Sequence, residues 1–322
     1  MRVLVGDIGG TKTALASVEL TAEGALRLHA PQRYPSADYP GLGPIVQAYL
    51  GMHATPCVGA AFAIAGPVAG RCSQATNLAW RIDADVLERE LGLAPVTLLN
   101  DLEAVAWGID ALAPEDVCEL QPGEPGGLGN RCVIAAGTGL GEAGLCWDGR
   151  RHHPFATEGG HAGFAPSDGC EWALLQFLQR RYRRVSWERL VSGMGIGAIH
   201  AFCCERAGEP LPQPSPTPAE IAAGAQRGDA CCAEAMALFF RLYGREAGDL
   251  ALKQMALGGV YLGGGIAPRN LEALRASAFL DAFLDKGRMR GLMQRMPVRV
   301  ILQPQVALLG AARAWLVGRA PD

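Results

Sequence analysis

An asparagine and an aspartate follow a short apolar segment near residue 100. Residues 96–99 (Val-Thr-Leu-Leu) predict a strand, Asn100 and Asp101 come directly after it, and residues 102–112 predict a helix. Both polar side chains therefore fall at the carboxyl end of a strand, where α/β sheets build their sites. Asp101 is equally well placed to cap the helix or to act as a base. As a base, it could accept the proton of an alcohol that attacks a phosphoryl group.

Two glycine turns each join a pair of predicted strands, within residues 3–20 and again within residues 132–147. Backbone N–H groups of such turns can approach phosphate oxygens closely, and a threonine hydroxyl adds a donor. Either turn alone could be a plain tight turn, but two of them could bind one polyphosphate. A nucleotide is therefore the simplest ligand that would account for both turns. The residues concerned are Asp7, Gly9, Gly10 and Thr11 in the first turn, and Gly137, Thr138 and Gly139 in the second.

Two familiar nucleotide motifs match the letters of these turns but not their context. Residues 6–13 nearly fit the P-loop pattern, yet a P-loop opens a helix and the following residues alternate as a strand. Residues 139–144 satisfy GxGxxG, and Glu158 lies near the spacing of a ribose-binding acid. However, residues 144–149 look like a strand that ends in a turn rather than a crossover helix. We therefore predict neither motif.

A carboxylate and an imidazole flank two glycines in Glu158-Gly-Gly-His161. His161 has no partner at a spacing that suits a metal site, so hydrogen bonding to sugar hydroxyls is the simpler role. Fixed donors and acceptors select a polyol because the wrong sugar leaves them unpaired. Glu188, ahead of a glycine-rich segment, is either another such acceptor or a surface charge.

Three consecutive glycines, Gly263, Gly264 and Gly265, follow the apolar strand predicted at residues 259–262. Their bare backbone could pack against an adenine ring. A simple turn is the alternative.

The elements around these residues predict an α/β protein of two lobes. A chain of 322 residues is long for one small core. The glycine- and proline-rich residues 121–130 interrupt the pattern, and a second hairpin follows, so each lobe begins with a similar hairpin. Helical periodicity dominates later, with one or two long helices in residues 221–253 and a compact helix at 306–316.

Composition excludes several classes of function. The net charge is -3 and charged residues make up 19% of the chain, so no basic field favours nucleic acid or an anionic membrane. No apolar run approaches the roughly 18 to 20 residues of a membrane span. The first seven residues meet polar and glycine positions too early for a secretory signal, and we expect a cytoplasmic protein.

The ten cysteines are dispersed, without a CxxC pair or a Cys/His cluster at zinc spacing. Reduced, mostly buried thiols are the plain interpretation. The adjacent pairs at 203–204 and 231–232 fall in helix-like stretches, and the sequence assigns them no chemistry.

Taken together, the motifs resemble those of bacterial glucokinases, within the sugar kinase, actin and Hsp70 ATPase superfamily. Residues 5–11 and 136–141 resemble the two phosphate motifs of the superfamily. The family-level resemblance lies in residues 76–80 (Thr-Asn-Leu-Ala-Trp), 99–101, 158–161, 186–189 and 261–266, in that order and with similar spacing.

The resemblance implies a two-lobed actin-like ATPase fold of ribonuclease H-like domains with an interlobe cleft. The small domain would span residues 1–112, completed by a C-terminal helix at 304–322, and the large domain residues 113–303. It also implies ATP-dependent phosphorylation of glucose at the 6-hydroxyl, with Mg²⁺, and a homodimer. The alternatives are another hexose or amino-sugar kinase, or a sugar-sensing regulator without turnover.

The resemblance also implies roles for individual residues. Asp101 would be the general base, and Asp7 would act near Mg²⁺, through water. Thr11 and Thr138, with the glycines of both turns, would lie near the phosphates, and residues 263–265 near adenosine. The residues implied to contact glucose are Asn100, Asp101, Glu158, His161 and Glu188.

Three features depart from the family pattern. Lys12 stands where such glucokinases often carry asparagine, and it resembles instead the related ROK (repressor, ORF, kinase) family. The cysteine-rich zinc motif of that family is missing after His161, where Cys170 stands alone, so no zinc is expected there. Glu142 adds a negative charge directly after the second turn.

Overall fold

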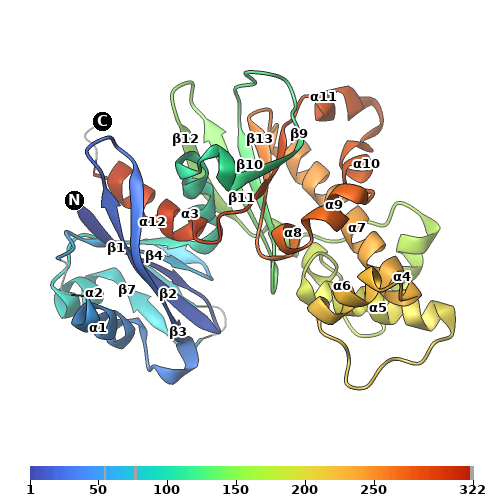
Figure 1. The fold of residues 1–322 in the computed structure, drawn as a ribbon, viewed down its shortest axis with the longest axis horizontal. Coiled ribbons are helices and arrows are strands. Elements are labelled where there is room, and N and C mark those ends of the chain that lie inside the picture. The colour runs from blue at the N-terminus through green and yellow to red at the C-terminus, as the bar shows by residue number, and fades with distance from the viewer. Residues whose placement is uncertain (54–55, 76–77, 320–322) are drawn as a thin grey trace. The chain divides into compact units, whose positions relative to one another are not determined.

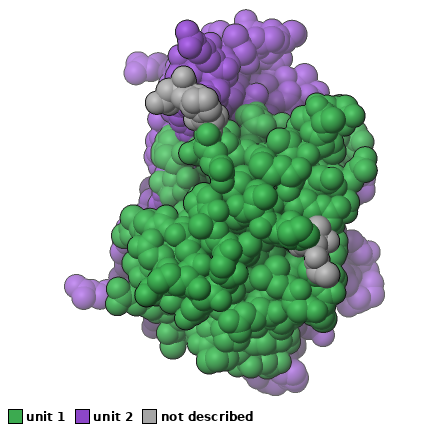
Figure 2. All heavy atoms as spheres, turned by 90° about the vertical axis from the view of Figure 1, so that its left-hand side faces the viewer, with its two compact units in different colours: residues 1–116, 154–156, 303–322 green, residues 117–153, 157–302 purple. Residues whose placement is uncertain are grey.

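The computed structural model describes residues 1–53, 56–75 and 78–319, in two compact units (Figures 1 and 2). Unit 1 comprises residues 1–116, 154–156 and 303–322, and unit 2 comprises residues 117–153 and 157–302. Thr76 and Asn77, which belong to one of the segments of family resemblance, lie outside the described residues.

The main sheet of unit 1 has five strands, β1 (Arg2–Ile8), β2 (Lys12–Leu20), β3 (Leu26–Pro35), β4 (Ala60–Ile64) and β8 (Val96–Asn100). Their order is β3-β2-β1-β4-β8. Strand β1 pairs antiparallel with β2 and parallel with β4, which pairs parallel with β8. The first glycine turn thus leads into a strand, and the rejection of a P-loop is confirmed.

Helices cover both faces of this sheet, which explains why β4 (Ala-Ala-Phe-Ala-Ile) is buried at every position. One face packs against α1 (Leu42–Met52) and α2 (Ala84–Leu91), the other against α3 (Asp101–Gly108) and α12 (Val306–Val317). The helix predicted at 102–112 is shorter than expected, because a 3-10 turn (Ile109–Ala111) follows Gly108. A small sheet of β5 (Val68–Ala69), β6 (Cys72–Gln74) and β7 (Arg81–Asp83) completes the unit.

Helices α3 and α12 approach each other closely through two glycines. A Cβ at Gly310 would overlap the carbonyl oxygen of Ala104, and one at Gly108 would overlap the carbonyl oxygen of Val306. Trp315 of α12 is buried and its Nε1 donates to the carbonyl of Pro95 at 2.9 Å. The last helix of the chain is therefore part of the core of unit 1.

Unit 2 repeats the topology of unit 1 in a sheet of six strands, β12 (His152–Thr157), β11 (Leu140–Trp147), β10 (Arg131–Ala136), β13 (Gly259–Gly263), β14 (Val298–Ile301) and β9 (Val117–Gln121). Strand β10 pairs antiparallel with β11 and parallel with β13, which pairs parallel with β14. This confirms the similar hairpin in each unit and the strand character of residues 144–147. Strand β9, at the sheet edge, carries no strong sequence pattern and was not predicted.

The helices of unit 2 account for most of its remaining residues, as Figure 1 shows. They are α4 (Gly169–Gln179), α5 (Gly193–Ala207), α6 (Pro218–Gln226), α7 (Ala230–Gln254), α8 (Ile266–Arg269), α9 (Leu271–Ala276), α10 (Phe279–Leu284) and α11 (Arg290–Gln294). Residues 221–253 form two helices because Gly228, at φ +88°, separates α6 from α7. None of the helices in the described part of the chain has the length and apolar character that a membrane span requires.

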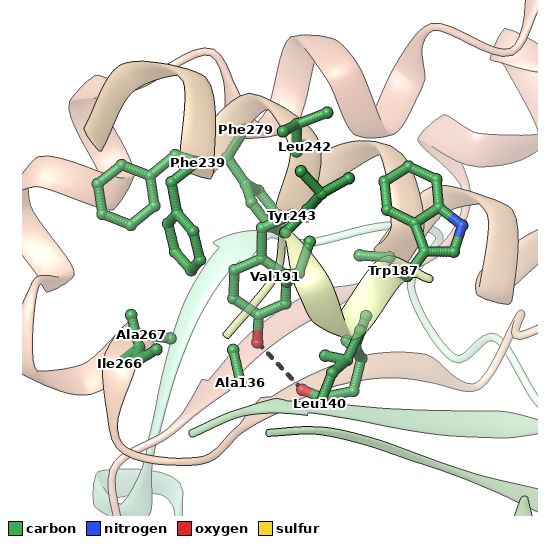
Figure 3. Close-up of a cluster of buried hydrophobic side chains, with 14 of the residues drawn as sticks. Ala136, Leu140, Trp187, Val191, Phe239, Leu242, Tyr243, Ile266, Ala267 and Phe279 are labelled. Carbon is green, nitrogen blue, oxygen red and sulfur yellow. Dashed lines mark hydrogen bonds between the residues drawn. The ribbon is translucent and has the colours of Figure 1, made fainter. Parts of the chain in front are cut away.

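The core of unit 2 lies directly beneath the second glycine turn (Figure 3). Tyr243 of α7 is fully buried, and its hydroxyl donates to the carbonyl of Ile134 at 3.1 Å. Its ring meets the ring of Phe279 edge to face at 5.4 Å. The long helix is thus bonded to the strand that leads into the turn.

Candidate active site

The carboxyl ends of three neighbouring strands in unit 1 lie in one row. Ile8 of β1 pairs with Ile64 of β4, and Ile64 pairs with Asn100 of β8. The register brings the first glycine turn and the Asn100-Asp101 pair to the same edge of the sheet. This is the edge where parallel strands of α/β proteins place their ligands.

Asn100, rather than Asp101, is the cap of helix α3. Its Oδ1 accepts hydrogen bonds from the N–H groups of Leu102 and Glu103 at 2.9 and 3.3 Å, and its Nδ2 donates to the carbonyl of Gly66 at 3.2 Å. Asp101 is the first residue of the helix, and its Oδ1 accepts from the N–H of Leu102 at 3.0 Å. The helix terminus favours a negative charge at this position.

Ser36, in the 3-10 turn η1 (Ser36–Asp38), forms hydrogen bonds to the backbone of the first glycine turn. The Ser36 hydroxyl donates to the carbonyl of Gly9 at 2.8 Å, and its N–H donates to the carbonyl of Thr11 at 3.1 Å. The hydroxyls of Ser36 and Thr13 lie 3.0 Å apart, and both residues are fully buried. Sequence reasoning missed Ser36, because its contacts reach across 27 residues and no local motif surrounds it.

Asp7 lies where β1 ends. Burial raises the pKa of Asp7 from 3.8 to about 6, and the guanidinium of Arg33 partly opposes the shift. Both residues line a hollow of about 450 Å³ in unit 1, together with Lys12 and Gln305. A half-buried carboxylate beside open space and cationic side chains is suited to bind a cation or a charged ligand.

The second glycine turn and the triple glycine segment are neighbours in unit 2. Ala135 of β10 pairs with Gly263 of β13, so the two segments leave adjacent strands. Gly264 has φ +75°, and a Cβ there would overlap the carbonyl oxygen of Ala136. Only glycine fits this close approach.

Glu188, in the 3-10 turn η5 (Trp187–Arg189), is bonded to the second glycine turn. Its Oε2 accepts from the N–H of Leu140 at 3.2 Å and would overlap a Cβ at Gly139. Its carbonyl accepts from the hydroxyl of Ser192 at 2.6 Å, which also caps α5. The side chain is half-buried, so the alternative of a plain surface charge was wrong.

Glu158 and His161 lie on a loop that is fastened to the Glu188 segment. Gly163 forms an antiparallel bridge with Ser186, and the N–H of Trp187 donates to the carbonyl of Ala162 at 3.0 Å. The carboxylate of Glu158 and Nε2 of His161 are 3.7 Å apart, and both side chains are mostly exposed. Unit 2 therefore brings together the three polar residues that the sequence singled out.

Comparison of the whole chain with known proteins decides the family. The model of the family described as Glucokinase matches residues 4–316. A glucokinase of Nostoc punctiforme is 42% identical, over 96% of this chain and 97% of the relative. The chain belongs to the glucokinase family.

Solved structures agree on the fold. A glucokinase from an Antarctic psychrotroph, at 29% identity, superposes with a TM-score of 0.87 over 97% of this chain and 98% of that one. A ROK family glucokinase from Streptomyces griseus, solved with glucose and AMPPNP, is 23% identical and gives a TM-score of 0.65 over 98% of this chain and 99% of that one. The second match shows the fold alone, and the expected actin-like ATPase fold is confirmed.

This member of the glucokinase family also carries a buried pair of acids beneath the Glu158 loop. The carboxylate of Glu142 lies against Gly159 and is 2% exposed, and its partner, Glu246 of α7, is 0% exposed. Burial raises the pKa of both groups, and for Glu246 the charge of Glu142 adds to the effect. In the described ranges neither oxygen of Glu246 has a hydrogen-bond partner, so burial and the nearby charge of Glu142 favour the protonated form of Glu246. Glu142 is thus an interior group, not an exposed charge beside the turn.

The acid pair makes stability depend on pH. Because the folded pKa of Glu246 lies above its ordinary value of 4.5, its contribution is complete below pH 4.5 and is lost as the pH rises. Glu246→Gln keeps the size of the side chain and cannot ionise. We expect its free energy of unfolding at pH 9 to exceed that of the parent by about 1–3 kcal/mol, with a smaller difference at pH 5. Thermal unfolding of both proteins between pH 5 and pH 9 measures this difference in stability.

Glu272→Gln, at an exposed position, is the control and should leave the pH profile unchanged. Parallel profiles for the parent and Glu246→Gln would contradict a raised pKa of Glu246 in the folded protein.

Proposed function

We propose that this enzyme transfers the γ-phosphoryl group of ATP to the 6-hydroxyl of glucose, with Asp101 as the general base. Membership of the glucokinase family supports the reaction. The observation that supports the assignment of the base is the place of Asp101, at the carboxyl end of β8 and at the same edge of the sheet as the first glycine turn. A carboxylate there accepts the hydroxyl proton as the sugar oxygen attacks.

Neighbouring groups prepare Asp101 for this role. The amide of Asn100 is held at both ends, by the N–H groups that it caps and by the carbonyl of Gly66. Its second amide hydrogen bonds no other described residue and can serve a sugar hydroxyl. The bond from the N–H of Leu102 orients the carboxylate of Asp101. Both side chains are therefore fixed before the substrate binds, which lowers the entropic cost of the reacting geometry.

The residues of unit 1 fit Mg²⁺ and a polyphosphate. Asp7 supplies a half-buried carboxylate oxygen, the ligand type that Mg²⁺ prefers, beside a hollow lined by Lys12. Bound Mg²⁺ would neutralise charge on the phosphates. We propose that Gly9, Gly10 and Thr11 bind phosphate oxygens through their N–H groups and hydroxyl.

In unit 2, we assign the remaining phosphate contacts to Gly137, Thr138 and Gly139, and the adenosine contact to residues 263–265. The S. griseus structure contains AMPPNP, which supports ATP as the donor. We assign Glu158, His161 and Glu188 to the sugar hydroxyls. Glu188 also bonds the second glycine turn, so it couples the sugar loop to the phosphate loop.

Removing the Ser36 hydroxyl should weaken ATP binding in particular. Ser36→Ala loses the bonds to Gly9 and Thr13 and loosens the first turn. At a net value of about 1 kcal/mol for each bond, we expect KM for ATP to rise roughly 5- to 30-fold, with KM for glucose nearly unchanged. Steady-state kinetics measure both. Ser277→Ala, which loses a similar bond to the carbonyl of Leu274 in unit 2, is the control, and an equal rise there would contradict a local effect.

A coupled assay of ADP release tests the function itself. Purified protein with Mg-ATP should turn over with glucose, and more slowly with fructose, mannose or N-acetylglucosamine. A higher kcat/KM with another hexose or an amino sugar would assign that substrate instead. Glucose binding without any sugar-dependent ADP release would replace the kinase by a sugar-sensing regulator.

The family relation supports two finer proposals, a homodimer and a cytoplasmic location. Light scattering of the purified protein tests the first, and cell fractionation tests the second.

A further inference from the structure

Three metal-binding side chains gather where α5 meets the start of α7, and the thiol of a fourth residue, Cys204, lies beside one of them. One ligand atom each from His200, Asp229 and Cys232 lies within 4.8 Å of the others. Cys204 follows His200 by one helical turn on α5, and its Sγ is 3.6 Å from Nε2 of His200. The sequence showed no such cluster, because the two helices are separate in the chain.

The donor set has a clear chemical preference. Two thiols and an imidazole are soft or borderline ligands, which select zinc and related ions rather than Mg²⁺ or Ca²⁺. Zn–S bonds of 2.3 Å and Zn–N bonds of 2.0–2.1 Å at a tetrahedral angle place sulfur and nitrogen about 3.5 Å apart. The separation of Cys204 and His200 matches that value.

The helices position these groups without help from a ligand. His200 and Cys204 stand at i and i+4 on α5, and therefore on one face. Asp229 caps α7, and its Oδ1 accepts from the N–H of Cys232 at 2.8 Å, which fixes the carboxylate beside the thiol. Bonds of this kind orient metal ligands in known sites.

Three of these four side chains are buried, and the fourth is exposed to solvent. His200, Cys204 and Cys232 are 4%, 3% and 7% exposed, whereas Asp229 is exposed. An ion could reach the site past Asp229.

We propose that His200, Cys204, Asp229 and Cys232 form a structural binding site for one Zn²⁺ ion per chain. Binding releases the thiol protons of both cysteines to solvent and joins α5 to α7. The first residue of α5, Gly193, donates its N–H to the carbonyl of Gly137 at 2.8 Å. The ion would thus secure the helix that supports the second glycine turn, and the proposal does not depend on the kinase activity.

Cobalt titration of the reduced, chelator-treated full-length protein tests the site. Co²⁺ bound by thiolates gives charge-transfer absorption, which a carboxylate site for Mg²⁺ does not produce. We expect this absorption to saturate at one Co²⁺ per chain, and Zn²⁺ to abolish it by competition. Cys204→Ser and Cys232→Ser should each weaken binding by 10-fold or more, and Cys146→Ser, at an exposed position, should not.

Thermal unfolding of the unaltered protein is the second measurement, in case a variant fails to fold. Zn²⁺ should raise Tm of the chelator-treated protein, since a ligand of the native state stabilises it, and Mg²⁺ should not produce the same rise. The absence of charge-transfer absorption would overturn the proposal, as would a signal that is lost in Cys146→Ser. A cobalt signal unchanged in both Cys204→Ser and Cys232→Ser would overturn it as well.

Discussion

Asp101→Ala will lower kcat by about 10²–10⁴-fold, the range expected when a general base is removed. KM for glucose should change much less, because the other sugar contacts remain. Asp101→Asn separates basicity from position, since its amide oxygen can still accept from the N–H of Leu102. We expect a comparable loss in this variant.

Steady-state kinetics give kcat and KM, and calorimetric titration gives glucose affinity. Asp85→Asn is the control, because Asp85 also lies in the first turn of a helix of unit 1 but belongs to no proposed site. Its kcat should match that of the parent. Retention of most of the activity in Asp101→Asn would mean that another group accepts the proton.

Gly310→Ala will strongly destabilise unit 1. The new Cβ would overlap the carbonyl oxygen of Ala104, so α12 must move away from α3. Overpacking against backbone costs about 3 kcal/mol. Because α3 begins at Asp101, the displacement should also lower kcat in the fraction that folds.

Urea unfolding measures the loss, with Gly51→Ala as a matched control. Gly51 lies in α1 of the same unit, and a Cβ there meets nothing within 4 Å. Alanine should stabilise that helix by about 0.5–1 kcal/mol. Equal effects of the two substitutions would contradict the close packing of α3 and α12.

Local patterns predicted the parts of the site that depend on neighbouring residues. Strand alternation located both hairpins, and the change from residues 96–99 to Asn100 and Asp101 marked the end of a strand. The cap was harder to assign, because either residue can accept from the helix N–H groups. Only the backbone geometry gives that role to Asn100.

Contacts between distant segments could not be predicted in the same way. Ser36 reaches Gly9 from the far end of β3, and Glu142 meets Glu246 from another element. A single serine or glutamate in a sequence has no pattern that distinguishes it from a surface residue. The edge strand β9 was missed for a related reason, since short edge strands lack a continuous apolar run.

The place of α12 bears on how the chain folds during its synthesis. A ribosome makes all of unit 2 before it adds Val306–Val317. Until then, apolar side chains of the unit 1 sheet, among them Val3, Val5 and Ala61, lack one of the two helices that cover their face of the sheet. Part of the apolar surface of unit 1 therefore stays exposed to solvent while the ribosome translates unit 2. Unit 2 can complete its core before unit 1 does, although most of unit 1 is translated first.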